Sequence, residues 1–120
     1  MVNHYKELKV WQKSFSQCMD VYQATISFPE WERYCLTSQI RRSAVLVPSF
    51  IAAGHGKKTI REYIHSLYTA FGSNCELETK LLLAVDLGYL NFEEKEKLKE
   101  TLREVGIMLR ALIGYLERRA

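Results

Sequence analysis

Five basic side chains in the middle of the chain are the residues best suited to chemistry. Arg41 and Arg42 are adjacent, and Lys57, Lys58 and Arg61 follow a Gly-His-Gly segment. From position 33 to position 61 there are six lysines or arginines and no Asp or Glu, so this quarter of the chain carries +6, whereas the whole chain carries +3. The chemistry that such a cluster of cations offers is anion binding.

The segment Gly-His-Gly-Lys-Lys-Thr at 54–59 invites comparison with phosphate-binding loops, but it does not match them. A P-loop has four residues between its glycines, followed directly by Lys and Ser or Thr, and it follows a strand. Here one residue separates the glycines, a second lysine intervenes, and a helix precedes. What remains is a simpler anion site, in which backbone N–H groups at the start of a helix lie beside Lys57, Lys58 and Arg61. An ordinary exposed basic turn is the alternative interpretation.

Arg41 and Arg42 differ in the direction that they face. About 100° of helix separates adjacent residues, so the two side chains cannot serve the same purpose. We expect one of them to meet a carboxylate inside the protein, and we predict a structural ion pair between Arg42 and Glu78, with Glu76 as the alternative acid. A buried acid without a cation would be costly, so Glu78→Ala should then destabilise the fold.

We predict that the protein is not an enzyme and has no catalytic residues. A helical-bundle ribonuclease of the HEPN type would place four to six residues between Arg and His, whereas three separate Arg61 from His65. No Ser-His-Asp set can be assembled from the sequence. Three widely spaced cysteines, Cys18, Cys35 and Cys75, form no CxxC and have no metal-ligand spacing with the histidines, so we predict neither metal nor cofactor.

The composition indicates one globular domain over residues 1–120. The chain is 48% hydrophobic and 26% charged, which is typical of a folded protein and not of a disordered one. Its longest nearly uncharged run, 43–56, is shorter than the ~20 apolar residues of a membrane-spanning helix. The first residues contain no apolar signal segment, and the cysteine count fits reduced thiols. We therefore expect a cytoplasmic protein with no membrane partner.

Hydrophobic periodicity predicts four helices, at about 6–27, 33–53, 60–87 and from Asn91 onward. Pro48 falls inside the second helix and should kink it, and the two glycines at 54 and 56 should stop it. Thr59 with Glu62, and Asn91 with Glu94, are N-terminal capping pairs, and Gly88 is a C-terminal stop. Short links between long helices predict an all-α fold, an antiparallel up-down-up-down four-helix bundle with helix two kinked at Pro48.

The spacing of apolar residues also predicts which face of each helix is buried. In the first helix the stripe with heptad steps is Leu8, Trp11, Phe15, Cys18, Tyr22 and Thr25. In the third helix the predicted stripe is Ile64, Leu67, Phe71, Leu81 and Val85, with Asn74 and Glu78 as polar members. The fourth helix has the most regular stripe, from Leu98 to Leu116, and a highly charged outer face that we expect to be solvated.

Three segments together cover about residues 5–90: YKELKVWQKS, FPEWERYCLTSQIRRSAVLVPSFIAAGHGKKTIREYIHSLYTAFGS and ELETKLLLAVDLGYL. They resemble the bacterial four-helix-bundle proteins called 23S ribosomal-RNA intervening-sequence proteins. The specific part is LTSQIRR through the proline to the Gly-x-Gly-Lys turn. Three positions depart from the family pattern: Phe50 and Ala53 replace a polar residue and an acid, and Phe71 replaces an arginine.

The resemblance implies a fold, an assembly and a partner class. Family members look like four-helix bundles that assemble into homopentamers. A related branch, the accessory variability proteins of diversity-generating retroelements, binds nucleic acid and a reverse transcriptase through a basic surface. On this basis the nucleic-acid-binding candidates are Arg41, Arg42, Lys57 and Lys58, which fall on the matching motif, together with the nearby Arg61.

Three functions remain as hypotheses. The first is a non-enzymatic homo-oligomeric bundle, pentameric by resemblance, that binds RNA, DNA or a nucleoprotein such as a ribosomal partner. The alternative is an accessory scaffold whose basic stretch meets a protein such as a reverse transcriptase. The third and least supported is a small ribonuclease, whose turnover would depend on His65.

Overall fold

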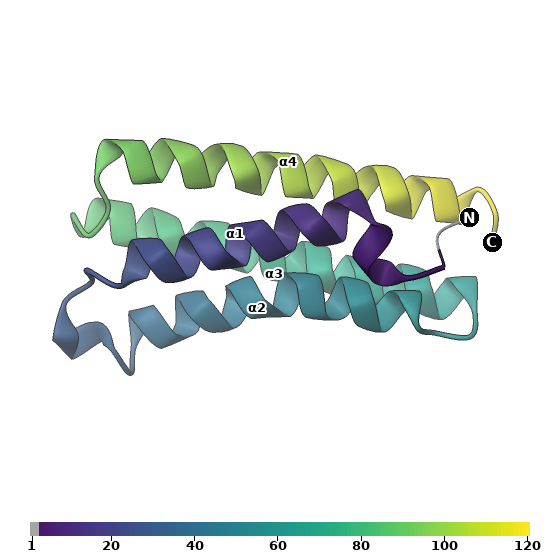
Figure 1. The fold of residues 1–120 in the computed structure, drawn as a ribbon, viewed down its shortest axis with the longest axis horizontal. Coiled ribbons are helices and arrows are strands. Elements are labelled where there is room, and N and C mark those ends of the chain that lie inside the picture. The colour runs from purple at the N-terminus through teal and green to yellow at the C-terminus, as the bar shows by residue number, and fades with distance from the viewer. Residues whose placement is uncertain (1–2) are drawn as a thin grey trace.

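Four long helices make up the chain in the computed structural model, which describes residues 3–120. They are α1 (Lys9–Thr25), α2 (Leu36–His55), α3 (Ile60–Asp86) and α4 (Phe92–Glu117), with 3-10 turns at Tyr5–Glu7 and Glu30–Glu32. Each helix packs against the next, α4 packs against α1, and the helices alternate in direction along a bundle about 45 Å long (Figure 1). The predicted all-α four-helix bundle is confirmed.

The predicted stop at Gly88 is confirmed by its backbone. Gly88 has φ +80°, a left-handed conformation that glycine adopts without a Cβ penalty. The N–H groups of Gly88 and Tyr89 donate to the carbonyls of Val85 and Ala84 at 3.0 and 2.9 Å. This pair of bonds is the Schellman motif, which satisfies carbonyls at the end of α3 and turns the chain toward α4.

Both predicted N-terminal caps are present, in two different forms. Asn91 accepts from the Glu94 N–H at 2.8 Å and Glu94 accepts from the Asn91 N–H at 3.1 Å, which is a complete capping box at the start of α4. At the start of α3 the Thr59 hydroxyl oxygen accepts from the Glu62 N–H at 3.1 Å. The same hydroxyl donates to the Glu62 carboxylate at 3.0 Å, so the glutamate bonds the threonine side chain and not the Thr59 backbone N–H of a complete capping box.

Pro48 and Gly54 both lie inside α2, which runs without a break from Leu36 to His55. Pro48 is buried and leaves the carbonyl four residues earlier without its helical N–H partner; the kink predicted there stays a prediction. Of the two glycines expected to stop the helix, Gly56 is its C-terminal cap as predicted, whereas the expectation for Gly54 is wrong. A Cβ at Gly54 would lie 2.9 Å from Ser66 Cβ and 3.0 Å from Tyr63, so this glycine permits the close approach of α2 and α3.

Two apolar clusters fill the interior, and a buried polar layer separates them. One cluster contains Ile40, Leu77, Leu81 and Leu98, and the other contains residues such as Leu109. Between them lie Gln17 of α1 and Asn74 of α3. Gln17 Nε2 donates to Asn74 Oδ1 at 3.1 Å, and Asn74 Nδ2 donates to the Leu102 carbonyl of α4 at 3.0 Å. Three helices therefore meet at one hydrogen-bonded layer, and the prediction that Asn74 lies on the buried seam is confirmed.

The predicted buried stripe of α1 is wrong at its aromatic members Phe15 and Tyr22, which are 49% and 40% exposed. Thr25 is buried as predicted, and the other predicted members, Leu8, Trp11 and Cys18, are half-buried against the core. The observed buried residues of α1 are Val10, Ser14, Gln17, Val21, Ala24 and Thr25, so smaller and polar side chains face the core. Two stripes with heptad spacing run along this helix, one residue apart. The larger apolar side chains follow the outer stripe, and for that reason the sequence pattern predicted that the outer stripe is buried.

At the end of the bundle opposite both chain termini, the α1–α2 connector and the α3–α4 loop are joined by one tyrosine. The Tyr89 hydroxyl donates to Glu32 Oε2 at 2.9 Å, and its ring lies 5.3 Å from the ring of Phe28. The hydrogen bond to Glu32 raises the pKa of the Tyr89 phenol, because it favours the protonated form beside a carboxylate. This contact ties residues 57 positions apart in the sequence.

Candidate nucleic-acid interface

Arg41 is committed to contacts within the bundle. Its Nε donates to Thr25 Oγ1 at 2.8 Å, one guanidinium nitrogen lies 3.3 Å from the Tyr22 carbonyl, and the guanidinium lies 4.6 Å from the Tyr22 ring centre. These partners are at the C-terminal end of α1, where a cation is favoured by the helix dipole. Arg41 therefore clamps α2 to α1, and its partners are a hydroxyl, a carbonyl and a ring instead of a carboxylate.

The predicted ion pair between Arg42 and Glu78 does not form. Both side chains are exposed, and no ion pair within residues 3–120 joins them. The buried seam of α3 passes through Asn74 and Leu77, so Glu78 lies one residue, about 100°, away from it. The alternative acid, Glu76, pairs with Lys80 at 3.8 Å on its own helix. Glu78→Ala is accordingly expected to leave stability unchanged.

The other three candidates lie together at the α2–α3 turn. Lys57, Lys58 and Arg61 are exposed, and none of them takes part in an ion pair in the described chain. The Glu62 carboxylate is held against Thr59 at the start of α3, so the backbone N–H groups there already face an acid. Anion binding at this turn would therefore depend on the three cationic side chains more than on the helix terminus.

The structure separates the two halves of the basic stretch. Arg42 lies 13 residues before the end of α2, which corresponds to about 20 Å along the helix axis. Arg41 and Arg42 are thus not part of one patch with Lys57, Lys58 and Arg61. The five residues are close together in the sequence, but Arg41 and Arg42 lie near the start of α2 and the other three lie beyond its end.

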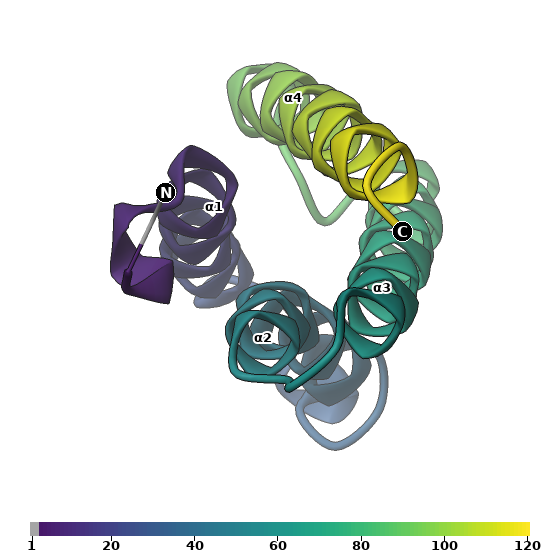
Figure 2. The ribbon, with the colours of Figure 1, turned by 90° about the vertical axis from the view of Figure 1, so that its right-hand side faces the viewer.

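The bundle instead brings new basic residues to the α2–α3 turn. The start of α1, the α2–α3 turn and the end of α4 all lie at the same end of the molecule (Figures 1 and 2). The cations there, which we call the basic end, are Lys6, Lys9, Lys57, Lys58, Arg61, Arg118 and Arg119. With three glutamates in the same segments (3–9, 55–62 and 115–120), their side-chain charge is +4.

The opposite end of the bundle has the opposite sign. Its segments, 26–35 and 86–97, contain six acidic and three basic side chains, a charge of −3. The molecule is therefore electrically polar along its 45 Å axis. The contribution of the first and last residues of the chain to this basic end was not predicted. The signal was available, because four antiparallel helices must place both termini at the end that holds the second link.

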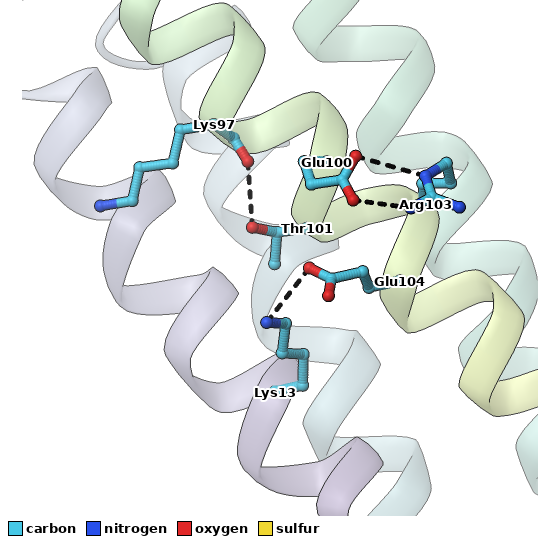
Figure 3. A network of polar contacts seen from close by, with 6 residues as sticks. All are labelled: Lys13, Lys97, Glu100, Thr101, Arg103 and Glu104. Carbon is cyan, nitrogen blue, oxygen red and sulfur yellow. Dashed lines mark hydrogen bonds and ion pairs between the residues drawn. The ribbon is translucent and has the colours of Figure 1, made fainter.

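Several charges along the middle of α4 take part in ion pairs, in contrast to the cations at the basic end. Lys13 of α1 lies 3.1 Å from Glu104 of α4, and Arg103 lies 2.6 Å from Glu100 (Figure 3). The hydrogen bond from Arg103 lowers the pKa of the Glu100 carboxyl. This charged face is exposed, as predicted, and its ion pairs reduce the positive charge that it presents to a partner.

A groove of about 490 Å³ runs beside the basic end between α2 and α3. We call it the α2–α3 groove; its lining includes Phe50, Ala53, Lys57, Arg61, His65 and Thr69. The Ser66 hydroxyl donates to the Phe50 carbonyl at 2.8 Å and so joins the two helices. Arg61 and His65, whose spacing does not match the ribonuclease pattern, line the same groove one helical turn apart.

In residues 3–120, no group of three or more His, Cys, Asp or Glu side chains lies close enough together to hold a metal ion. In the same residues, no helix combines the length and apolar character that crossing a membrane requires. Cys18 is half-buried, and burial raises the pKa of its thiol, which lowers the thiolate fraction at neutral pH.

Comparison with known proteins connects this geometry to a family. The model of the family described as 23S rRNA-intervening sequence protein matches residues 6–111. A crystal structure from Bacteroides thetaiotaomicron VPI-5482, described as a protein with unknown function from the S23 ribosomal protein family, is similar with a TM-score of 0.78. The two chains are 21% identical, and the match covers 87% of this chain and 97% of the other, which supports the fold. No curated protein matches the chain.

Proposed function

Because this chain belongs to the 23S rRNA-intervening sequence protein family, we propose that it is a homo-oligomeric helical bundle that binds RNA through its basic end. The observation that carries the proposal is the concentration of cations without ion-pair partners where three segments of the chain meet. Lys57, Lys58 and Arg61 are the central residues, with Lys6 and Arg118 beside them. The protein acts by binding and does not catalyse a reaction.

The charge distribution supports a polyanion as the partner. Lysines and arginines that take part in no ion pair are free to neutralise phosphates, and the released counterions contribute most of the binding free energy at low salt. The −3 charge of the opposite end repels the same partner, so RNA should approach one end of the bundle only. The Arg41 guanidinium is already hydrogen-bonded to α1, and Arg42 lies too far away to share a phosphate with Lys57.

Assembly into a ring is the second part of the proposal. The outer stripe of α1 leaves Phe15 and Met19 49% and 54% exposed beside Val45 and Pro48 of α2, and these residues line an apolar groove of about 330 Å³. Exposed contiguous apolar surface of this kind marks interaction sites. A second copy is the proposed occupant, and a pentamer would repeat the net charge of +3 five times around one axis.

The proposal is tested by binding assays on single-stranded and double-stranded RNA. The double variant Lys57→Glu and Lys58→Glu should lose at least tenfold in affinity while its helical circular dichroism is unchanged. The matched control is Lys95→Glu and Lys99→Glu, which alters two cations of α4 toward the other end and should bind like the wild type. Equal loss in both variants would refute a localised interface.

The remaining hypotheses are distinguished by the same samples. Recovery of an acidic protein such as a reverse transcriptase, without RNA, would favour the scaffold. Turnover of RNA that His65→Ala abolishes would favour a ribonuclease. Light scattering of the purified protein, together with its absorbance at 260 nm, would establish the subunit number and any RNA carried through purification.

A further inference from the structure

The α2–α3 groove has a composition that the basic end as a whole does not have. An aromatic ring, Phe50, faces the same groove as two cations, Lys57 and Arg61, with His65 one turn further along α3. A surface that only attracts phosphates needs cations alone. The half-buried Phe50 packs against the core cluster that contains Leu67 and leaves part of its ring on the wall of this groove.

We propose that this groove binds a single strand of nucleic acid, with one base stacked on Phe50 and the neighbouring phosphates on Lys57 and Arg61. The inference rests on the proposed function and specifies its substrate class. Proteins that bind single strands combine a cationic groove with aromatic side chains on which bases stack. A base in a duplex is already stacked on both faces, so a ring set in a groove wall reaches only unpaired bases.

The geometry of the walls fits this division of roles. Phe50, Ala53 and Lys57 follow one another at three- and four-residue steps from the last turns of α2 into the turn beyond it, so the ring and the ammonium group line the same wall. Arg61 and His65 form the facing stripe on α3. Ala53 is exposed between Phe50 and Lys57 and leaves room above the groove, where a longer side chain would stand in the path of a strand.

The floor of the groove is rigid, which favours a preformed site. The Ser66 hydroxyl bonds the Phe50 carbonyl at 2.8 Å, and Gly54 packs so closely on Ser66 that a Cβ there would lie 2.9 Å away. These contacts fix the spacing of α2 and α3 below the lining side chains. Glu62 is the one carboxylate that lines the groove in the described residues, and Thr59 holds one of its oxygens at 3.0 Å.

The experiment measures fluorescence anisotropy of a labelled 12-nucleotide oligouridylate and of a 12-base-pair RNA duplex. We expect the wild type to prefer the single strand at least tenfold. Phe50→Leu keeps an apolar side chain against the core and should weaken single-strand binding about tenfold without changing the salt dependence, because stacking is lost and no charge is removed. Phe50→Tyr should restore the affinity, and Phe92→Leu, at the other end of the bundle, should have no effect.

Inorganic polyphosphate, which has charge and no bases, serves as the competing probe. Phe50→Leu should leave polyphosphate binding unchanged, whereas Arg61→Gln should weaken polyphosphate and oligouridylate alike. Ala53→Glu should weaken oligouridylate binding by placing a carboxylate in the groove. The inference is overturned if duplex and single strand bind equally, or if Phe50→Leu binds oligouridylate as the wild type does while Lys57→Glu with Lys58→Glu abolishes binding. Absence of binding to any nucleic acid would instead refute the proposed function itself.

Discussion

Asn74 is the residue whose substitution tests the buried polar layer most sharply. Its amide accepts from Gln17 at 3.1 Å and donates to the Leu102 carbonyl at 3.0 Å, and it is 5% exposed. In Asn74→Leu both hydrogen bonds are lost, and Gln17 is left fully buried with its amide nitrogen unpaired. Gln17 Oε1 already has no partner among the described residues, so the whole amide would then be unsatisfied.

The expected cost follows from that arrangement. Leaving a buried polar group unsatisfied costs about 1–3 kcal/mol, whereas the Leu102 carbonyl keeps its helical partner and adds little. The extra apolar surface of leucine offsets part of the loss, so Asn74→Leu should reduce the free energy of unfolding by about 2 kcal/mol. For a chain of this length that is a fall in Tm of roughly 8 °C. Urea unfolding followed by circular dichroism, at one fixed protein concentration, measures it.

A double-mutant cycle supplies the control. Gln17→Met replaces the buried amide with an unbranched apolar chain of similar size, and it removes the group that Asn74→Leu would leave unsatisfied. The double variant should therefore be at least 1 kcal/mol more stable than the sum of the single changes predicts. If Asn74→Leu alone is as stable as the wild type, or if the two changes are additive, the hydrogen-bonded layer does not contribute as described.

Three further predictions concern packing, pH and assembly. Gly54→Ala should lower the free energy of unfolding by about 1–2 kcal/mol, because the overlap of the new Cβ with α3 outweighs the gain in helix propensity. At Gly72 a Cβ meets no atom within 4 Å, so Gly72→Ala should raise the free energy of unfolding by up to about 1 kcal/mol. The reverse order of the two variants in urea unfolding would contradict this packing. The raised pKa of Tyr89 favours its neutral form in the folded state, so its contribution to stability is present below roughly pH 10 and lost above it. The free energy of unfolding should therefore fall less steeply between roughly pH 9 and 11 in Tyr89→Phe than in the wild type. Parallel curves for the two proteins would exclude the hydrogen bond to Glu32. Phe15→Lys, at an exposed position, should leave the protomer folded but reduce its mass by light scattering, and an unchanged mass would remove the α1 face from the proposed interface.

Local rules predicted the helices and most of their ends. Gly88 and Asn91 act where they were expected, because a left-handed glycine and a capping amide depend only on residues three or four positions away. Gly54 was misassigned for the opposite reason. Its role depends on Ser66 of another helix, and nothing within a few residues of Gly54 in the sequence indicates that contact.

The choice of buried face was less predictable than the existence of the helices. On α1 the stripe with Phe15 and Tyr22 has the larger apolar side chains, yet the stripe with Gln17 and Val21 is buried. Side-chain size therefore does not decide which of the two stripes faces the core. On α3 the buried residue is Leu77, one position before the predicted Glu78. Glu78 therefore faces solvent, and the predicted ion pair with Arg42 does not form.

The candidate site was half predictable. Lys57, Lys58 and Arg61 stand where the sequence places them, at an exposed turn. The partners of Arg41 could not be foreseen, because a carbonyl and a hydroxyl on another helix carry no sequence signature. From the sequence, Phe50 was identified only as a departure from the family pattern, and only the arrangement of α2 against α3 places it in a groove with Lys57.

The most direct test of the central claim is the salt dependence of RNA binding at the basic end. If Lys57, Lys58 and Arg61 each neutralise one phosphate of a single strand, the logarithm of the association constant should fall with the logarithm of salt concentration with a slope of about −2 per protomer. The variant with Lys57→Glu and Lys58→Glu should lose most of that slope together with its affinity. An affinity indifferent to salt, or a slope unchanged by the charge reversal, would contradict the account.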